Sequence, residues 1–158
     1  MSTKFDFKEQ IKVGDRGQEL FLQNYHSPLV VFPEHKADFK RVSDGKLVEL
    51  KTDTYNMEKT PNFFWEYLSD IQKLKPGGPW QSRMHRVPVF CYMFVRHNVY
   101  YEFDTKELVK FLTPIAEEIH AKNKLLWIKN KGWITGGFTY PREAMKHLYT
   151  EHRFEVKQ

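Results

Sequence analysis

Three residues in the first third of the chain, Asp38, Glu49 and Lys51, have side chains and a spacing that could support metal-dependent hydrolysis. Two carboxylates make an oxygen-rich site that suits Mg²⁺ or Mn²⁺. A lysine beside them can orient or deprotonate a water, or offset the charge of a phosphate. A metal ion would activate the water, and a second ion would stabilise the leaving oxygen. Together these groups indicate cleavage of a phosphodiester bond.

The surrounding sequence predicts how these side chains meet. Residues 37–42 and 46–51 read as two strands, and an Asp-Gly pair between them is a strong hairpin signal. Side chains alternate along a strand, so Glu49 and Lys51 share one face. A tight hairpin would bring the Asp38 carboxylate close to that of Glu49. The same E-x-K pattern also occurs on solvated sheet faces, where it forms cross-strand ion pairs.

Hydrophobic periodicity and chain breakers predict the remaining elements. We expect helices at 5–25, 80–86, 105–121 and 142–151, and further strands at 28–34, 62–68, 87–95, 99–103 and 125–128. Thr105 is expected to cap the third helix, and Thr-Gly-Gly at 135–137 is expected to form a turn. This order predicts an α/β or α+β fold, with helices flanking a central mixed sheet. Residues 1–158 are expected to form a single domain.

The composition of the chain limits which partners it can bind and in which cellular compartment it can work. The formal net charge of +5 favours a polyanionic partner such as nucleic acid, although a merely soluble basic protein would have the same balance. The chain has a single cysteine, Cys91, which lies in an apolar run. One cysteine cannot form an internal disulfide or a cysteine-based zinc site. No apolar stretch reaches the ~20 residues that span a bilayer. We therefore expect a cytoplasmic protein without a membrane segment.

The segment DFKRVSDGKLVELK, residues 38–51, resembles the D-x(n)-E-x-K core of the PD-(D/E)XK nuclease superfamily. The predicted order of helix, three strands, helix and strand is similar to the core of that superfamily. KTDTYNMEKTPNFFWEYLSD and KPGGPWQS, which follow, resemble phage-encoded and prophage-encoded members with an aromatic-rich strand ending in Glu and a Gly-Gly-Pro loop. The resemblance covers about residues 10–110. It departs from the pattern at Ala37, where the family has a proline that supplies no ligand.

The resemblance implies a restriction-endonuclease-like core and further site residues. Many members have a Glu on the first helix that completes the metal site. Glu19 matches it, with a solvated helix carboxylate as the alternative. Gln81 corresponds to a Gln near the catalytic lysine and the substrate, or else it is an N-cap or solvated residue. Glu66 is either another acidic contact or, as we favour, an ion-pair partner of Lys59 or Lys73.

These observations lead us to expect a divalent-metal-dependent nuclease that acts on DNA, in the host cytoplasm if phage-encoded. The Leu50 carbonyl is expected as a further oxygen ligand of Mg²⁺ or Mn²⁺, because backbone oxygens bind hard cations well. The expected catalytic residues are Asp38, Glu49, Lys51, Glu19 and Gln81, the metal ligands Asp38, Glu49, Leu50 and Glu19, and the DNA-backbone contacts Lys73, Lys75, Arg83 and Arg86.

Several alternatives stay open at this level. An endonuclease is favoured, while an exonuclease or a junction resolvase would use the same groups. A resolvase would act as a two-fold homodimer in order to cut two strands symmetrically. The sequence does not separate DNA from RNA. The rival function is a non-catalytic nucleic-acid-binding or scaffold module on the same fold.

Weaker motifs lie outside this core. Residues 96–98 (Arg-His-Asn) are expected to form a hairpin turn. WIKNKGW, residues 127–133, alternates aromatic residues with lysines as single-strand binding surfaces do. We favour a core tryptophan beside a solvated basic loop for this segment. His147 and His152 are expected at surface positions of the last helix.

Overall fold

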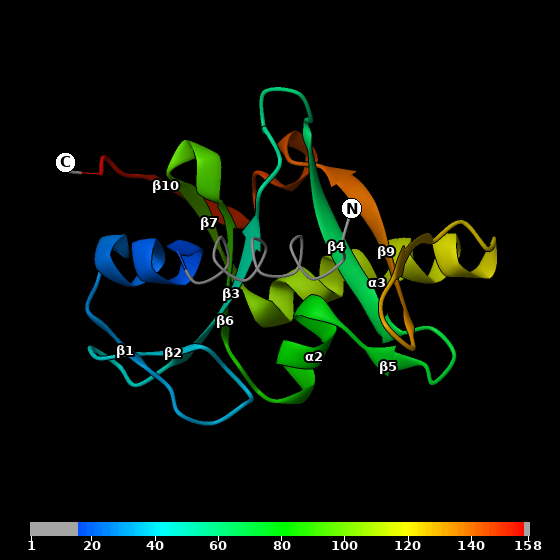
Figure 1. Cartoon of the computed structure of the whole chain (residues 1–158), viewed down its shortest axis with the longest axis horizontal. Coiled ribbons are helices and arrows are strands. Elements are labelled where there is room, and N and C mark those ends of the chain that lie inside the picture. Colours follow the sequence, from blue (N-terminus) through cyan, green and yellow to red (C-terminus); the bar gives the residue numbers. More distant parts are fainter. Residues whose placement is uncertain (1–15, 157–158) are drawn as a thin grey trace.

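The computed structural model describes residues 16–156 and has an α+β fold with two sheets (Figure 1). A six-stranded mixed sheet and a four-stranded antiparallel sheet hold its strands. The strands are β1 (Leu29–Val31), β2 (Phe39–Arg41), β3 (Leu47–Asp53), β4 (Asn62–Asp70), β5 (Lys75–Pro76), β6 (Val89–Phe94), β7 (Val99–Asp104), β8 (Leu126–Lys129), β9 (Ile134–Pro141) and β10 (Tyr149–Arg153). The helices are a first helix at 16–24, α2 (Gly78–Met84) and α3 (Thr105–Ala121), with short 3-10 turns η1 (Val95–His97) and η2 (Glu143–Met145).

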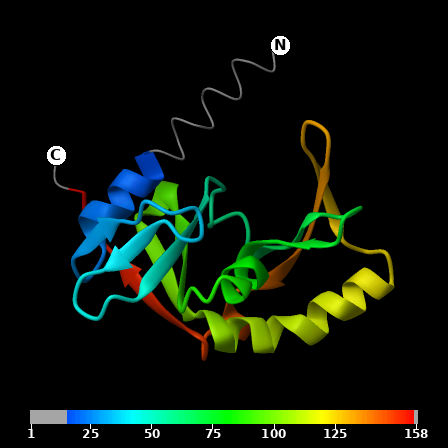
Figure 2. The same ribbon diagram turned by 90° about the horizontal axis from the view of Figure 1, so that it is seen from below.

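The six-stranded sheet has the order β1-β2-β3-β6-β7-β10, and its strands β3 and β6 run parallel. Alternation divides the side chains of the central strands between two cores. On one face, Val48, Cys91 and Tyr100 pack against Phe21 and Tyr25 of the first helix and the turn after it. On the other face, the core includes residues of the second sheet and of α3, namely Phe63, Trp65, Phe90, Tyr92, Tyr101, Leu108 and Leu112. Figure 2 shows the first helix and α3 on opposite sides of the strands.

The second sheet has the order β5-β4-β9-β8, and it was not foreseen as a separate sheet. The turn expected at residues 135–137 is wrong, because these residues lie inside β9. A Cβ on Gly137 would approach Phe64 Cζ and the Trp65 carbonyl oxygen to 2.5 Å. The glycine therefore permits close contact with β4 and does not form a turn. The chain reverses at Lys131 and Gly132 instead, where Gly132 has φ +98°.

The helix expected at residues 142–151 is also wrong. After the short turn η2, the chain forms β10, which pairs with β7 through Tyr149 opposite Phe103. The Tyr149 ring packs edge-on against Tyr101 with ring centroids 4.8 Å apart. Pairing at the β7 edge and burial of this ring outweigh the local helix signal of the preceding proline.

The other expected elements are confirmed with shifted ends. The first helix is confirmed over residues 16–24, and its expected part at 5–15 lies outside the described residues. The cap of α3 is Asp104 and not Thr105, since Asp104 Oδ1 accepts the Glu107 N–H at 3.0 Å. Cys91 is fully buried, as its apolar surroundings indicated. Within residues 16–156, no helix has the length and apolar character required to cross a bilayer.

Gly137→Ala is expected to lower the free energy of unfolding by about 1–3 kcal/mol, because a methyl group there would push against the β4 backbone. Urea unfolding at fixed temperature measures this change. Thr139→Ala, at an exposed position of the same strand, is the control and should change stability by about 0.5 kcal/mol or less. Equal effects of the two substitutions would show that the close contact between β4 and β9 contributes nothing.

Candidate active site

Asp38 and Glu49 face each other at the open end of the β2–β3 hairpin. In the β2–β3 register Phe39 lies opposite Val48, so the next pair outward consists of Asp38 and Glu49. The backbone of Asp38 stays beside β3, because its N–H donates to the Val48 oxygen at 3.2 Å. The hairpin expected from the sequence is therefore confirmed, and it brings the two carboxyl groups together.

The electrostatics of the pair show how closely these groups interact. Burial raises the pKa of Glu49 well above that of an ordinary carboxyl group, and the hydrogen bond and charge of Asp38 raise it further. Two half-buried carboxylates in contact repel each other when both are ionised. A divalent cation between them would remove this repulsion, so the donor set fits a hard metal ion.

Two further oxygen donors lie near this pair. The Leu50 N–H donates to Asp38 Oδ2 at 2.9 Å. Because the N–H and C=O of one strand residue point to the same edge, the Leu50 carbonyl also points toward β2. Glu19, exposed on the first helix, lines with Asp38 one cavity of about 480 Å³. The structure thus brings all four expected ligand residues to the same end of the hairpin.

Lys51 lies on the same face of β3 as Glu49 but in a different environment. Its Nζ lies 5.4 Å from the centroid of the Phe64 ring and 5.9 Å from that of Tyr92. Burial lowers the pKa of Lys51, while the charges of Glu66 and Asp53 act in the opposite direction. A lysine in such surroundings releases its proton more readily than a solvated one.

Glu66 is a site residue that sequence reasoning undervalued. The ion pair with Lys59 or Lys73 that we favoured is absent from the salt bridges of residues 16–156. Glu66 Oε2 instead accepts the Gly78 N–H at 3.1 Å, and its charge faces Lys51. The only signal in the sequence was its position at the end of an aromatic strand, which does not reveal a partner on β3.

Gln81 lies on α2, one turn beyond Gly78, and is exposed. Its expected N-cap alternative is wrong, because the N-cap of α2 is Gly77, whose oxygen accepts the Gln81 N–H at 3.2 Å. The start of α2 packs against Glu66, which in turn faces Lys51. The contact with Glu66 is thus made by Gly78, and the exposed Gln81 lies one turn farther along the helix.

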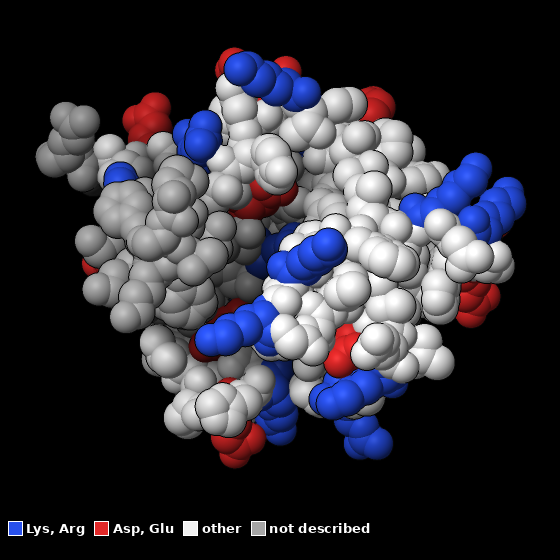
Figure 3. All heavy atoms as spheres, turned by 45° about the vertical axis from the view of Figure 1, so that its right-hand side comes forward, with Lys and Arg blue, Asp and Glu red and all other residues white. Residues whose placement is uncertain are grey.

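The four expected contacts to the DNA backbone fall into two exposed groups. Lys73 and Lys75 lie at the turn between β4 and β5. Arg83 and Arg86 line a separate hollow of about 330 Å³ together with Lys106 at the start of α3. Neither group lines the cavity of Asp38 or the one of Lys51. Figure 3 shows Lys and Arg side chains around a hollow in one face of the molecule, with Asp and Glu at its margins.

The basic aromatic segment at residues 127–133 differs from the favoured expectation. Neither tryptophan belongs to a core: Trp127 is 65% exposed and Trp133 is 47% exposed. The segment forms most of β8 and the loop of the β8–β9 hairpin, which projects from the body of the molecule (Figure 2). The expected hairpin turn at residues 96–98 is confirmed, since η1 connects β6 to β7 there.

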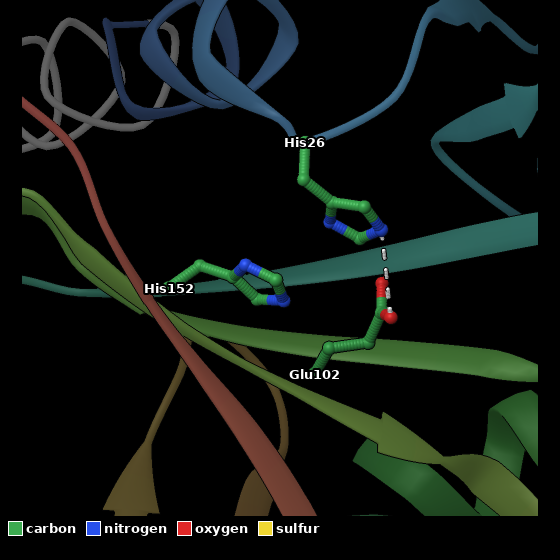
Figure 4. A group of neighbouring side chains, drawn as sticks. All are labelled: His26, Glu102 and His152. Carbon is green, nitrogen blue, oxygen red and sulfur yellow. Dashed lines mark ion pairs between the residues drawn. The ribbon is translucent and has the colours of Figure 1, made fainter.

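A second cluster of ligand-type side chains consists of His26, Glu102 and His152 (Figure 4). Their ligand atoms all lie within 4.8 Å of one another, and they come from the turn after the first helix, from β7 and from β10. The surface helix position expected for His152 is therefore wrong, because the residue lies on β10. The expected helix is likewise absent around His147, which is exposed and contacts Phe111.

In this cluster the two histidine rings stack on each other beside the Glu102 carboxylate. The His26 and His152 rings are nearly parallel, at 9° with centroids 4.4 Å apart, so their nitrogen lone pairs do not converge on one point. Glu102 already accepts a hydrogen bond from the Tyr25 hydroxyl, and Arg41 Nη1 lies 4.0 Å from its other oxygen. A metal ion would bind here only after one ring turned and Arg41 moved away.

The histidine stack should make stability depend on pH. Burial lowers the pKa of His152 below its ordinary value of 6.5, the charge of His26 lowers it further, and Glu102 opposes both. The unfolded chain then binds more protons than the folded one, so stability should fall as the pH drops below about 6.5. His152→Phe should flatten the dependence of the unfolding free energy on pH between 8 and 5. His147→Phe is the control, and an equal flattening there would contradict this assignment.

No protein-family model matches the chain, and no curated protein matches it. The grouping of Asp38, Glu49 and Lys51 therefore rests on the β2–β3 register, on the contact between two carboxyl groups and on the shared face of β3.

Proposed function

We propose that the chain is a divalent-metal-dependent nuclease of the PD-(D/E)XK type, which hydrolyses phosphodiester bonds in DNA. One observation carries the proposal: Asp38 and Glu49 are in contact across a hairpin, and Lys51 follows on the same face of the same strand. The arrangement of a helix, a hairpin and a parallel β3–β6 pair supports a restriction-endonuclease-like core.

Mg²⁺ or Mn²⁺ fits the donor set at the end of this hairpin. The carboxylates of Asp38 and Glu49 would hold the ion, with the Leu50 carbonyl and Glu19 as further oxygen donors. A bound ion would lower the pKa of a water and offset negative charge on the phosphate. The contact between Asp38 and Glu49 favours such a cation, because without one the two groups cannot both ionise freely.

Lys51 is the residue that would act on the water or on the phosphate. In the hydrolysis, the oxygen of water forms a bond to phosphorus while one ester bond breaks, and the water loses a proton. Lys51 would either accept this proton at Nζ, a role that its lowered pKa eases, or remain a cation that offsets phosphate charge. Glu66 and Asp53 are positioning residues, since their charges face the lysine.

A non-catalytic nucleic-acid-binding module is the second candidate. The exposed apolar hairpin β8–β9 favours it, because this surface could bind a partner without any cleavage. The two candidates differ in the use of Asp38, Glu49 and Lys51, which a purely binding protein does not require. Metal-dependent cleavage separates them, and a panel of single strand, duplex, flap and four-way junction DNA would also define the class of nuclease.

Mn²⁺ at a concentration 100-fold above its Kd should stabilise the fold by about 2.7 kcal/mol, because it binds only the folded chain. A thermal melt with and without Mn²⁺ measures the effect. Asp38→Asn and Glu49→Gln should both abolish the Mn²⁺-dependent increase in Tm and the cleavage of the DNA panel. Glu58→Gln, an exposed carboxylate outside the site, serves as the control. An increase in Tm that survives both site substitutions would place the metal elsewhere.

Lys51→Met should leave the fold and the Mn²⁺-dependent stabilisation intact while it lowers cleavage at saturating DNA by about 100-fold or more. Methionine keeps the apolar contacts with Phe64 and Tyr92 and removes the amine. Lys40→Met, at an exposed position of β2, is the matched control. If Lys51→Met cleaves at the parent rate, the lysine serves only to balance the charges of Glu66 and Asp53.

A further inference from the structure

One face of the second sheet forms a continuous surface that ends at Lys51. Leu126 and Ile128 of β8 lie on this face, and together with Phe64 and Thr139 they line a cavity of about 480 Å³ that also includes Lys51. The β4–β9 register confirms that two of these residues share a face, because Phe64 is paired with Thr139. The surface thus runs from the β8–β9 hairpin across β9 and β4 to the lysine.

Trp133 extends this surface to the tip of the hairpin. The Asn130 N–H donates to the Trp133 oxygen at 2.9 Å, so these two residues form the last pair before the two-residue loop. Counted back from that pair, Trp133 lies on the same face as Ile128 and Leu126. Trp127 lies on the opposite face of β8. We call the surface formed by Phe64, Leu126, Ile128, Trp133 and Thr139 the platform.

The platform is apolar and open. Leu126 is 51% exposed, Ile128 45% and Trp133 47%, although all three are large apolar side chains. Between them and β4 lies Gly137, which has no side chain to project from the sheet. Large apolar side chains that gather on one exposed surface mark a binding site.

The charge around the platform identifies the kind of ligand. Residues 119–142, which include the whole hairpin, contain no Asp or Glu, and Asp53 is the one carboxylate among the residues that line the cavity. The cations of the hairpin itself are Lys129 and Lys131. In the same segment, Lys122 pairs with Glu118, and Arg142 donates to the carbonyl oxygens of Thr60 and Met57. A polyanion with flat apolar groups fits such a surface, and a nucleic-acid strand offers both when its bases are unpaired. A duplex hides the faces of its bases, so it would contact the lysines alone.

We propose that the platform binds unpaired nucleotides and leads the strand to Lys51. This inference rests on the proposed nuclease function and names its substrate class: single-stranded nucleic acid, or the unpaired strand at the end or branch of a duplex. Residues 134–139 of β9 span about 17 Å at the rise of a β-strand. That length accommodates about five nucleotides at the ~3.4 Å spacing of a stacked strand.

Fluorescence anisotropy with a labelled 12-nucleotide single strand, and with the blunt duplex of the same sequence, tests the proposal. EDTA prevents cleavage, so only binding is measured. Trp133→Ala should weaken binding of the single strand by about tenfold, the usual effect of removing one stacking ring. Ile128→Thr keeps a β-branched side chain in the strand and should also weaken it. Binding of the duplex should change by less than about twofold.

Trp127→Ala is the matched control, because Trp127 is 65% exposed on β8, beside Ile128, but faces away from the platform. It should leave single-strand affinity unchanged. Equal losses for Trp127→Ala and Trp133→Ala, or equal affinity for single strand and duplex, would overturn the proposal. A dimer in light scattering that Trp133→Ala dissociates would also overturn it, since a second copy would then cover the platform.

The salt dependence of binding separates two paths for the strand. Removing Lys129 and Lys131 with glutamine should reduce the slope of log affinity against log salt by about 0.7 for each lost phosphate contact. Arg83→Gln with Arg86→Gln should reduce the single-strand slope less than the lysine pair does. The reverse result would place the strand along α2 and refute the platform.

The outcomes also distinguish this inference from the proposed function. If Trp133→Ala weakens single-strand binding but no DNA of the panel is cleaved with Mn²⁺, the platform stands and the nuclease assignment fails. If cleavage depends on Asp38 and Lys51 but Trp133→Ala binds as the parent does, the nuclease assignment stands and the platform fails.

Discussion

Strand β3 is hydrogen-bonded on both sides, and this double pairing decides which of its side chains enter which core. It pairs antiparallel with β2 and parallel with β6. A shift by one residue would exchange Glu49 and Lys51 with Val48 and Leu50. Val48 is fully buried against the first helix, so the apolar face opposes such a shift. The position of the chemical groups thus depends on apolar packing on the opposite side of the sheet.

The environment of Lys51 depends on both sheets at once. The lysine belongs to β3, while Glu66 and Phe64, which face it, belong to β4 of the second sheet. Glu66 is held in turn by the N–H of Gly78 at the start of α2. A Cβ on Gly77 would approach the Glu66 carboxylate to 2.6 Å, so the backbone there must be free of side chains. The electrostatic environment of the lysine therefore depends on how β4 of the second sheet packs beside β3 of the first.

Sequence alone was sufficient for the parts of the site that local signals determine. A turn pair and strict alternation define the hairpin, and they place Asp38 opposite Glu49 without any distant contact. The same reasoning failed where distant contacts decide. Gly137 reads as a turn residue until the backbone of β4 is seen beside it. Glu66 and His152 likewise acquire their surroundings from strands far away in the sequence, which no local pattern reports.

The pairing of the last strands bears on how the chain folds as it leaves the ribosome. β4 pairs with β9 and β7 pairs with β10, so each sheet lacks one of its strands until these later segments have been made. Contacts between such distant segments close large loops, which slows folding. Until then, the aromatic side chains of β4 and β7 are without part of their cover, and the nascent chain is exposed to aggregation. The six-stranded sheet is therefore complete only once β10 has been made, long after the hairpin that holds the carboxylates.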